Sequence, residues 1–299
     1  MPYVVANGLR FHVQQLGDPT APPVVMVHGL LSGSVASWYF GLAPVLARSR
    51  YVLMYDQRGH GLSERPLRGY TLTELAADLD DLTGPLGPCA LVGHSFGGLV
   101  ALRHAIDHPD RVTSVALVDS FSPASPDRAS VGSGGNGLRG ADADSIGLDA
   151  SDLDAIAIDT VDIEGIRAWE RDRRRSRERR GPSGKPVRRR RRATGEQILL
   201  GGTTVLSDVR RDSQLDTTAL AGLRIPLLCA MGSASPFRNE VEALAHQLPA
   251  DQCRLEVLDG GHALHVDAPT ELAEAVTGFL AGEAHDQKVR VSAQGGRHG

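Results

Sequence analysis

The sequence predicts an α/β fold, in which a mostly parallel, twisted sheet of about eight strands is flanked by helices. Short β-type runs alternate with helical patterns over the first 120 of the 299 residues and again after residue 222. The later β-type runs are apolar at consecutive positions, as is typical of strands buried on both faces of a parallel sheet. About 100 residues interrupt the alternation. We therefore expect an insertion after the sixth strand, at the sheet edge where ligands bind in open α/β sheets.

The individual elements follow from these patterns in chain order. The expected strands are residues 9–16, 23–27, 51–55, 89–92, 112–118, 226–231 and 254–258. The expected helices are residues 38–47, 71–82, 96–107, 239–248 and 270–280, with further helical patterns at 153–169 and 194–208. The helix over 96–107 should end before His108, because a residue that precedes proline disfavours helical geometry.

The chain divides into a core and an insertion on this reading. Residues 1–120 and 223–282 form the expected core, and residues 121–222 form a cap inserted into it. The polar tail, residues 283–299, is expected to be flexible.

Two charged stretches stand out in and beside the expected cap. Residues 119–164 carry ten acids against two arginines, whereas residues 171–192 carry 13 Lys or Arg against two acids, a local charge of +11. The simplest interpretation of the arginine-rich segment is a solvated, mobile cap loop. A more specific interpretation is that the segment attracts an acidic partner, such as an acyl carrier protein or a coenzyme A thioester. Nucleic-acid binding is not expected, because no aromatic residues interleave with the arginines and no known binding module surrounds them.

Composition excludes several other classes of protein. The chain is 41% hydrophobic and 23% charged, which is ordinary for a globular protein. Its longest apolar runs are a handful of residues, whereas a membrane span needs about 20. The N-terminus lacks the pattern of a signal peptide, and three scattered cysteines are too few for a disulfide framework or a four-ligand zinc site. We expect a cytoplasmic protein, and arginine-rich usage typical of GC-rich coding suggests a bacterial one.

The strongest chemical signal is a Gly-x-Ser-x-Gly turn at residues 93–97, between an expected strand and an expected helix. Glycines allow such a turn to be tight, and its strained geometry projects the hydroxyl of Ser95 above the sheet. This context predicts that Ser95 is a nucleophile.

A second motif precedes it along the chain. The strand at 23–27 leads into His28, Gly29 and Leu30. The backbone N–H of Leu30 can meet that of Phe96, at the start of the helix after Ser95. Two such donors form an oxyanion hole, which the positive end of the helix dipole strengthens. His28 itself is expected to be structural.

A third motif lies after the last expected strand, where Asp259, two glycines and His262 form a loop ahead of a helix. A histidine on such a loop can fold back over the sheet and act as a general base toward Ser95. We therefore choose His262 among the eleven histidines.

These three motifs, in this order, resemble the α/β-hydrolase superfamily, and the resemblance covers both core segments. Residues 56–63 are similar to that family's structural Asp-x-Arg-Gly-x-Gly-x-Ser loop. The resemblance implies a nucleophile at Ser95, a base at His262, an oxyanion hole at Leu30 and Phe96, and a cap over the site.

The triad acid is where the chain departs from the family pattern. The family usually carries Gly-x-x-Asp after the strand that ends here at Met231, but this chain has serine, Ser235, in place of the acid. Asp119, at the end of the strand over 112–118, is the best replacement, because some relatives place the acid there. Glu240 or another cap residue is an alternative, as is a Ser–His dyad without an acid. Under the Asp119 assignment, removal of the Ser235 hydroxyl should barely matter.

The sequence as a whole predicts a serine hydrolase that cleaves a carboxylic ester or thioester through an acyl-enzyme on Ser95. An acyltransferase or cyclising thioesterase, in which an alcohol or amine replaces water, stays open, as does a non-hydrolytic relative. Serine at position 95 argues against relatives with a carboxylate nucleophile. These residues require no metal and no organic cofactor, and the expected partner is a small acyl substrate.

Overall fold

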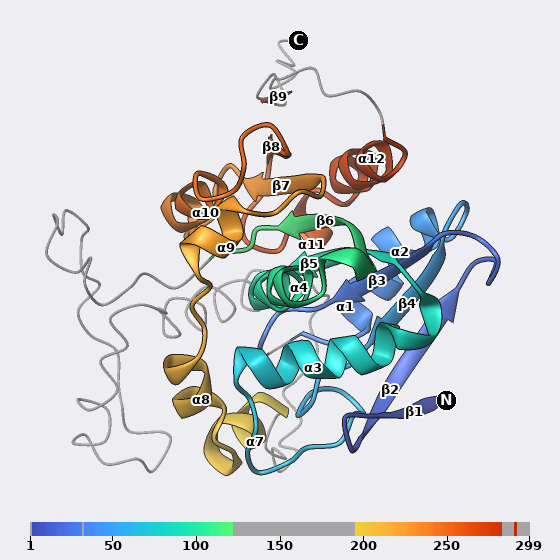
Figure 1. Cartoon of the computed structure of the whole chain (residues 1–299), viewed down its shortest axis with the longest axis vertical. Coiled ribbons are helices and arrows are strands. Elements are labelled where there is room, and N and C mark those ends of the chain that lie inside the picture. Colours follow the sequence, from blue (N-terminus) through green and yellow to red (C-terminus); the bar gives the residue numbers. More distant parts are fainter. Residues whose placement is uncertain (1, 32, 122–194, 283–289, 292–299) are drawn as a thin grey trace, which may run out of the picture. The chain divides into compact units, whose positions relative to one another are not determined.

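The computed structural model describes residues 2–31, 33–121, 195–282 and 290–291 (Figure 1). Its strands form one sheet in the order β1-β2-β4-β3-β5-β6-β7-β8-β9. Strands β1 and β2 pair antiparallel, as do β2 and β4, and every other pair is parallel. The strands are β1 (Tyr3–Ala6), β2 (Leu9–Leu16), β3 (Pro23–Val27), β4 (Tyr51–Tyr55), β5 (Cys89–His94), β6 (Val112–Val118), β7 (Leu227–Gly232), β8 (Cys253–Leu258) and β9 (Arg290–Val291).

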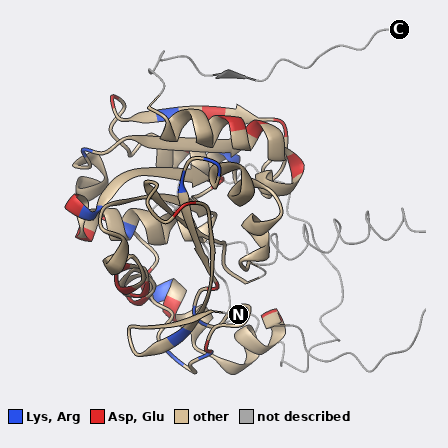
Figure 2. Cartoon of the chain, turned by 90° about the vertical axis from the view of Figure 1, so that its right-hand side faces the viewer, with Lys and Arg blue, Asp and Glu red and all other residues tan. Residues whose placement is uncertain are grey.

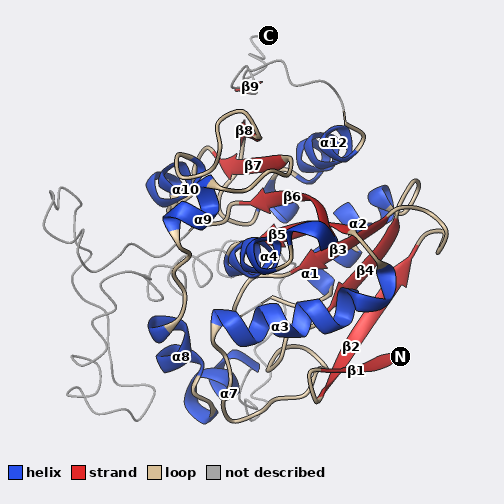
Figure 3. Cartoon of the chain, in the orientation of Figure 1, coloured by secondary structure: helices blue, strands red, loops and turns tan. Residues whose placement is uncertain are grey.

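Helices connect the parallel strands and cover the sheet (Figure 3). They are α1 (Ala36–Tyr39), α2 (Leu42–Leu46), α3 (Leu72–Thr83), α4 (Phe96–Asp107), α7 (Gly195–Gly202), α8 (Val205–Arg211), α9 (Thr217–Ala221), α10 (Arg238–Ala245), α11 (Leu264–Asp267) and α12 (Pro269–Leu280). Helix α3 starts at a capping box, in which Thr71 accepts from the N–H of Glu74 and the Glu74 carboxylate accepts from the N–H of Thr71.

The core on one face of the sheet comes from alternate strand positions. Side chains two apart on each strand point to the same face, and pairs such as Val24 with Met26 and Val52 with Met54 join one buried cluster with Trp38 of α1 and residues of α2 and α12. Helices α3 and α4 contribute nothing to this cluster and pack against the other face. The sheet is therefore buried on both faces, which explains why β3 to β7 carry no Lys, Arg, Asp or Glu. Figure 2 shows such residues on helices and loops around the sheet.

The expected strands all form, and the helix over 96–107 has the expected bounds. The helix expected over 38–47 is split into α1 and α2 at Gly41, whose φ of −131° and ψ of −95° are not helical. Strand β1 was not anticipated. Its hairpin with β2 turns at Asn7 and Gly8, which both have positive φ. Asn-Gly is a strong hairpin signal, so the sequence did contain the information for β1.

Part of the expected cap lies within the described residues. The segment after residue 194 forms α7, α8 and α9, and it is tied to the start of α3. Asp208 Oδ2 accepts from the N–H of Tyr70 (3.0 Å), and the carbonyl of Asp212 accepts from the N–H of Leu72 (3.0 Å). The arginine-rich segment 171–192 and the helical pattern at 153–169 lie outside the described residues, so the proposed roles of this charge stay predictions. The tail contributes the two-residue strand β9 beside β8.

None of the helices in the described part of the chain is long and apolar enough to cross a membrane. The three cysteines are free thiols.

Candidate active site

Ser95 occupies the sharp turn between β5 and α4. Its φ of 53° and ψ of −126° are strained for a residue with a side chain, and it is the residue that caps α4. Its N–H donates to the carbonyl of Val118 (3.0 Å), so the turn is fixed to the end of the neighbouring strand β6. The sequence motif therefore folds into the strained strand–turn–helix that we expected for it.

Close backbone packing holds this turn against the loop after β3. A Cβ added to Gly97 would lie 2.4 Å from the carbonyl oxygen of His28 and 2.5 Å from that of Val27. A Cβ added to Gly29 would lie 3.3 Å from Cβ of Ser95. The loop that carries Leu30 therefore runs directly beside Ser95, as the expected oxyanion hole requires.

Buried histidines fix the conformation of that loop. Leu31 has a φ of 69°, and its N–H donates to Nε2 of His60 (3.0 Å). His28 donates from Nδ1 to the carbonyl of Gly29 (2.8 Å), and its Nε2 accepts from the N–H of Gln57 (2.9 Å). Burial lowers the pKa of His28, and it lowers that of His60 to about 3, with the repulsion between the two rings when both are protonated as a further cause. Both rings are therefore neutral at pH 7 and act through single, defined tautomers.

His262 and Asp119 meet directly. Nδ1 of His262 lies 2.7 Å from Oδ2 of Asp119, and both side chains are buried. A carboxylate can only accept at neutral pH, so Nδ1 carries the proton and Nε2 is the basic nitrogen of the neutral ring. This is the orientation that a general base toward a serine hydroxyl needs.

Asp119 is itself held by the segment after β7. The N–H of Gly232 donates to Oδ1 (2.8 Å), and the hydroxyl of Ser235 donates to Oδ2 (2.6 Å). Asp119 also has a left-handed φ of 45°, so its backbone as well as its side chain is constrained. Ser235 stands where the family usually has its acid, and in this chain it binds the carboxylate that comes from β6 instead. The sequence did not reveal this contact.

The ring of His262 lies among other aromatic rings, one of which belongs to the residue before Ser95. The ring of His94, the residue before Ser95, lies 4.8 Å from that of His262, and His94 Nε2 donates to the carbonyl of His262 (2.9 Å). Burial is the main reason why the pKa of His94 is well below its ordinary value. The ring of Phe237 meets His262 edge-on at 4.9 Å and stacks on Phe121 at 4.4 Å.

Phe121 and Phe237 are residues that sequence reasoning missed. Both are almost fully buried, and they follow β6 and β7 at the same sheet edge as Ser95 and Asp119. Their positions directly after strands at this edge are the signal that could have found them.

The loop over residues 56–63 is a structural support, as its resemblance to the family loop implied. Asp56 accepts from the N–H groups of Val35 (2.7 Å) and Leu62 (2.9 Å). Arg58 binds Asp78 of α3 through two hydrogen bonds, from Nε (2.6 Å) and from Nη2 (2.5 Å). These contacts tie the loop to the helix that packs against α4.

The site residues predicted from the sequence thus converge at one edge of the sheet. Asp119 is in contact with His262, whose backbone is bound by the residue before Ser95. Leu30 lies on the loop that abuts Ser95, and Phe96 begins α4. Glu240, the alternative acid, belongs to α10, and the carboxylate hydrogen-bonded to Nδ1 of His262 is that of Asp119. The arrangement brings an imidazole, a carboxylate hydrogen-bonded to it and a hydroxyl on a strained turn to one edge of the sheet, and these are the groups that nucleophilic attack by a hydroxyl requires.

Comparison with known proteins agrees with this architecture. Residues 22–136, which include Ser95 and Asp119 but not His262, match the family model described as the alpha/beta hydrolase fold. RutD of Variovorax paradoxus is 40% identical over 119 residues, 38% of this chain and 44% of that protein. Epoxide hydrolase A of Mycobacterium tuberculosis is 38% identical over 120 residues, 38% of this chain and 37% of that one. The matches thus span less than half the length of these relatives.

A solved structure extends the similarity over both core segments. The enol-lactonase from Burkholderia xenovorans LB400 superposes with a TM-score of 0.65 and 21% sequence identity, and the match covers 94% of this chain and 100% of that one. At this identity the likeness concerns the fold. Together with the family model and the sheet topology, it shows that the chain has the α/β-hydrolase fold.

Proposed function

We propose that the protein is a serine hydrolase that cleaves a carboxylic ester or thioester through an acyl-enzyme on Ser95. The observation that carries this proposal is the Asp119–His262 hydrogen bond beside a strained Ser95. Relatives named as a hydrolase and a lactonase support the broader class of reaction. An epoxide-type reaction through a carboxylate nucleophile is disfavoured, because the nucleophile position holds serine.

The proposed reaction proceeds in two balanced halves. Oγ of Ser95 attacks the acyl carbon while Nε2 of His262 takes the hydroxyl proton, and the carbonyl oxygen becomes an oxyanion held by the N–H groups of Leu30 and Phe96. The tetrahedral intermediate expels the alcohol or thiol, which receives the proton from His262. Water then attacks the acyl carbon of the acyl-enzyme while Nε2 of His262 takes its proton. The bond between the acyl carbon and Oγ breaks, His262 returns the proton to Oγ, and the acid and free Ser95 are released.

Asp119 acts through His262 in both halves. Its carboxylate stabilises the imidazolium that forms at each proton transfer and keeps the proton of the neutral ring on Nδ1. The N–H of Gly232 and the hydroxyl of Ser235 donate to this carboxylate and hold it in position beside His262.

The test of this proposal needs no knowledge of the substrate. The intact protein is incubated with a fluorophosphonate, its mass is measured, and the labelled peptide is mapped. We expect one adduct on Ser95 that is absent in Ser95→Ala and strongly slowed in His262→Ala. Folded wild-type protein that takes up no label and hydrolyses no small activated ester contradicts the proposal.

A second experiment separates hydrolysis from acyl transfer. The acyl-enzyme is formed with a small activated ester, and alcohols, amines or thiols are offered in competition with water. Hydrolysis that persists at high acceptor concentration supports the proposed function, whereas near-complete capture by one acceptor favours the acyltransferase alternative.

The arginine-rich segment 171–192 suggests a class of substrate that the same assay can address. If the segment attracts an acyl carrier protein or a coenzyme A thioester, KM for that substrate should rise steeply with salt, while KM for a small neutral ester should not. Equal salt dependence of the two substrates argues against this partner.

A further inference from the structure

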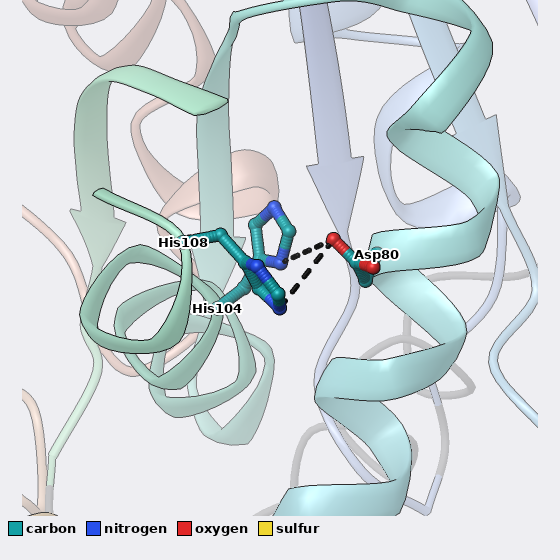
Figure 4. Close-up of side chains that lie close together, drawn as sticks. All are labelled: Asp80, His104 and His108. Carbon is teal, nitrogen blue, oxygen red and sulfur yellow. Dashed lines mark ion pairs between the residues drawn. The ribbon is translucent and has the colours of Figure 1, made fainter. Parts of the chain in front are cut away.

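Three side chains that the proposed reaction does not use converge where α3 packs against α4 (Figure 4). Asp80 comes from α3, His104 lies on the last turn of α4, and His108 is the residue that ends α4. Oδ1 of Asp80 lies 3.8 Å from Nδ1 of His104 and 3.5 Å from Nε2 of His108. One donor atom from each of the three residues lies within 4.8 Å of the other two.

The sequence spacing explains part of this convergence. His104 and His108 are four residues apart, so they share one side of the end of α4, and their rings lie 5.2 Å apart. Asp80 is brought to them by the packing of α3 on α4. Two imidazoles and one carboxylate are a donor set that binds zinc-like divalent ions.

His104 points to a ligand independently of this spacing. Its side chain is completely buried, yet neither ring nitrogen has a hydrogen-bond partner in the described part of the protein. Buried polar groups are normally paired, because an unpaired one has lost its hydrogen bonds to water without replacement. Burial also lowers the pKa of His104 to about 4, so its ring is neutral at pH 7 and has a lone pair to donate.

Arg111 is the cation that now neutralises Asp80. Its Nη1 binds Oδ1 of Asp80, and its Nη2 donates to the carbonyl of the same residue (3.2 Å). The Arg111 side chain is 28% exposed, so its guanidinium can move into water when another cation takes Oδ1. Arg111 therefore competes with a metal ion for the site.

We propose that Asp80, His104 and His108 bind a zinc-like divalent cation, with water as the fourth ligand. In a tetrahedral site with bonds of about 2.0 Å, neighbouring donor atoms are about 3.3 Å apart. The separations of 3.5 and 3.8 Å around Oδ1 are close to that value, and the third pair of donor atoms lies within 4.8 Å, so side-chain rotations that bring the two imidazoles closer together would complete the site.

The metal would hold α3 to α4 at a distance from the reaction. Ser95 begins α4 and the three ligands lie at or beside its other end, and a helix of 12 residues is about 18 Å long. We therefore expect zinc to raise the stability of the fold without being needed by Ser95.

Titration of the metal-stripped, untagged protein with Zn²⁺ tests the site, by calorimetry and by thermal unfolding. We expect one equivalent to bind and Tm to rise by about 4 °C at a free zinc concentration 100 times Kd. His108→Gln, which changes a half-exposed side chain, should weaken binding by about 100-fold or more, since loss of an outer-shell partner alone costs 10–100-fold. His104→Gln should do the same.

Two further variants make the assignment specific. Arg111→Ala removes the competing cation and should tighten zinc binding about fivefold, the equivalent of an exposed ion pair of about 1 kcal/mol. His246→Gln, a change at an exposed histidine after α10, should bind zinc as the wild type does.

Co²⁺ provides a readout of the ligands themselves. Its visible absorption in the wild type should indicate four- or five-coordination and should be lost in His108→Gln. No stoichiometric binding by the wild type, or equal binding by wild type and His108→Gln, overturns the proposal.

Discussion

Replacement of Asp119 by asparagine removes one negative charge from a fully buried position that three donors surround. The amide oxygen can still accept from the N–H of Gly232. The new NH₂ group then faces Nδ1 of His262 and selects the ring tautomer that carries its proton on Nε2. That tautomer cannot accept the proton of Ser95, so we expect kcat to fall by about 10³–10⁴, or about 4–5 kcal/mol of transition-state stabilisation.

The assay is the rate at which a fluorophosphonate labels Ser95, followed by kcat on an activated ester. Asp259→Asn is the matched control, because Asp259 is exposed, lies three residues before His262 and undergoes the same change in charge. It should label at the wild-type rate. Labelling of folded Asp119→Asn within threefold of the wild type would refute the assignment of Asp119 as the triad acid.

Ser235 allows a rescue experiment. Its Oγ lies 2.6 Å from Oδ2 of Asp119, so aspartate at 235 places a carboxylate close to the lost one. The double variant Asp119→Asn with Ser235→Asp should recover at least about tenfold over Asp119→Asn. Ser235→Asp alone should lower activity, because two adjacent carboxylates share a proton. Ser235→Ala should cost about tenfold, since it removes a hydrogen bond to a charged acceptor worth about 1.5 kcal/mol. From the sequence alone almost no loss is expected.

Three further changes test the supports of the site. Gly97→Ala places a Cβ against two backbone oxygens, so unfolding in urea should show a loss of about 1–3 kcal/mol, whereas Gly201→Ala, in open space on α7, should not destabilise. Ser95→Gly relieves a positive φ and should be more stable than Ser95→Ala by about 1 kcal/mol; equal stabilities would mean that the turn is unstrained. His60 has a native pKa of about 3, below the 6.5 of the unfolded chain, so only the unfolded state takes up its proton as pH falls below 6.5. The free energy of unfolding should therefore fall by up to about 1.4 kcal/mol per pH unit because of His60. Urea unfolding from pH 7 to 4.5 should show that this free energy depends less steeply on pH in His60→Gln than in the wild type, whereas His246→Gln should behave as the wild type does.

Most of the fold could be predicted from the sequence, because the signals that mark its strands and helices are local. The apolar runs of the strands and the proline after His108 each act within a few residues, and the elements appear where they indicate. The split between α1 and α2 depends on the backbone angles of Gly41, and no apolar period marks it.

The site could be predicted from the sequence only in part, because only some of its residues lie in local motifs. Ser95 and His262 lie in motifs whose residues are contiguous in sequence. The contact between Asp119 and Ser235 joins residues 116 positions apart, and it exists only because β6 and β7 are neighbours in the sheet. The position of Phe237 against His262 depends on the same neighbourhood.

The turn at Ser95 rests on main-chain atoms, because Gly97 presses against the carbonyls at the end of β3 with no side chain between them. Side-chain substitutions cannot adjust this contact in small steps, because it joins backbone atoms. This part of the protein therefore offers almost nothing for the evolution of substrate specificity. Phe121 and Phe237 are different: they stack on each other and can exchange volume between them while the turn stays unchanged. A laboratory library aimed at new substrates should therefore hold residues 93–98 constant and vary this aromatic pair together.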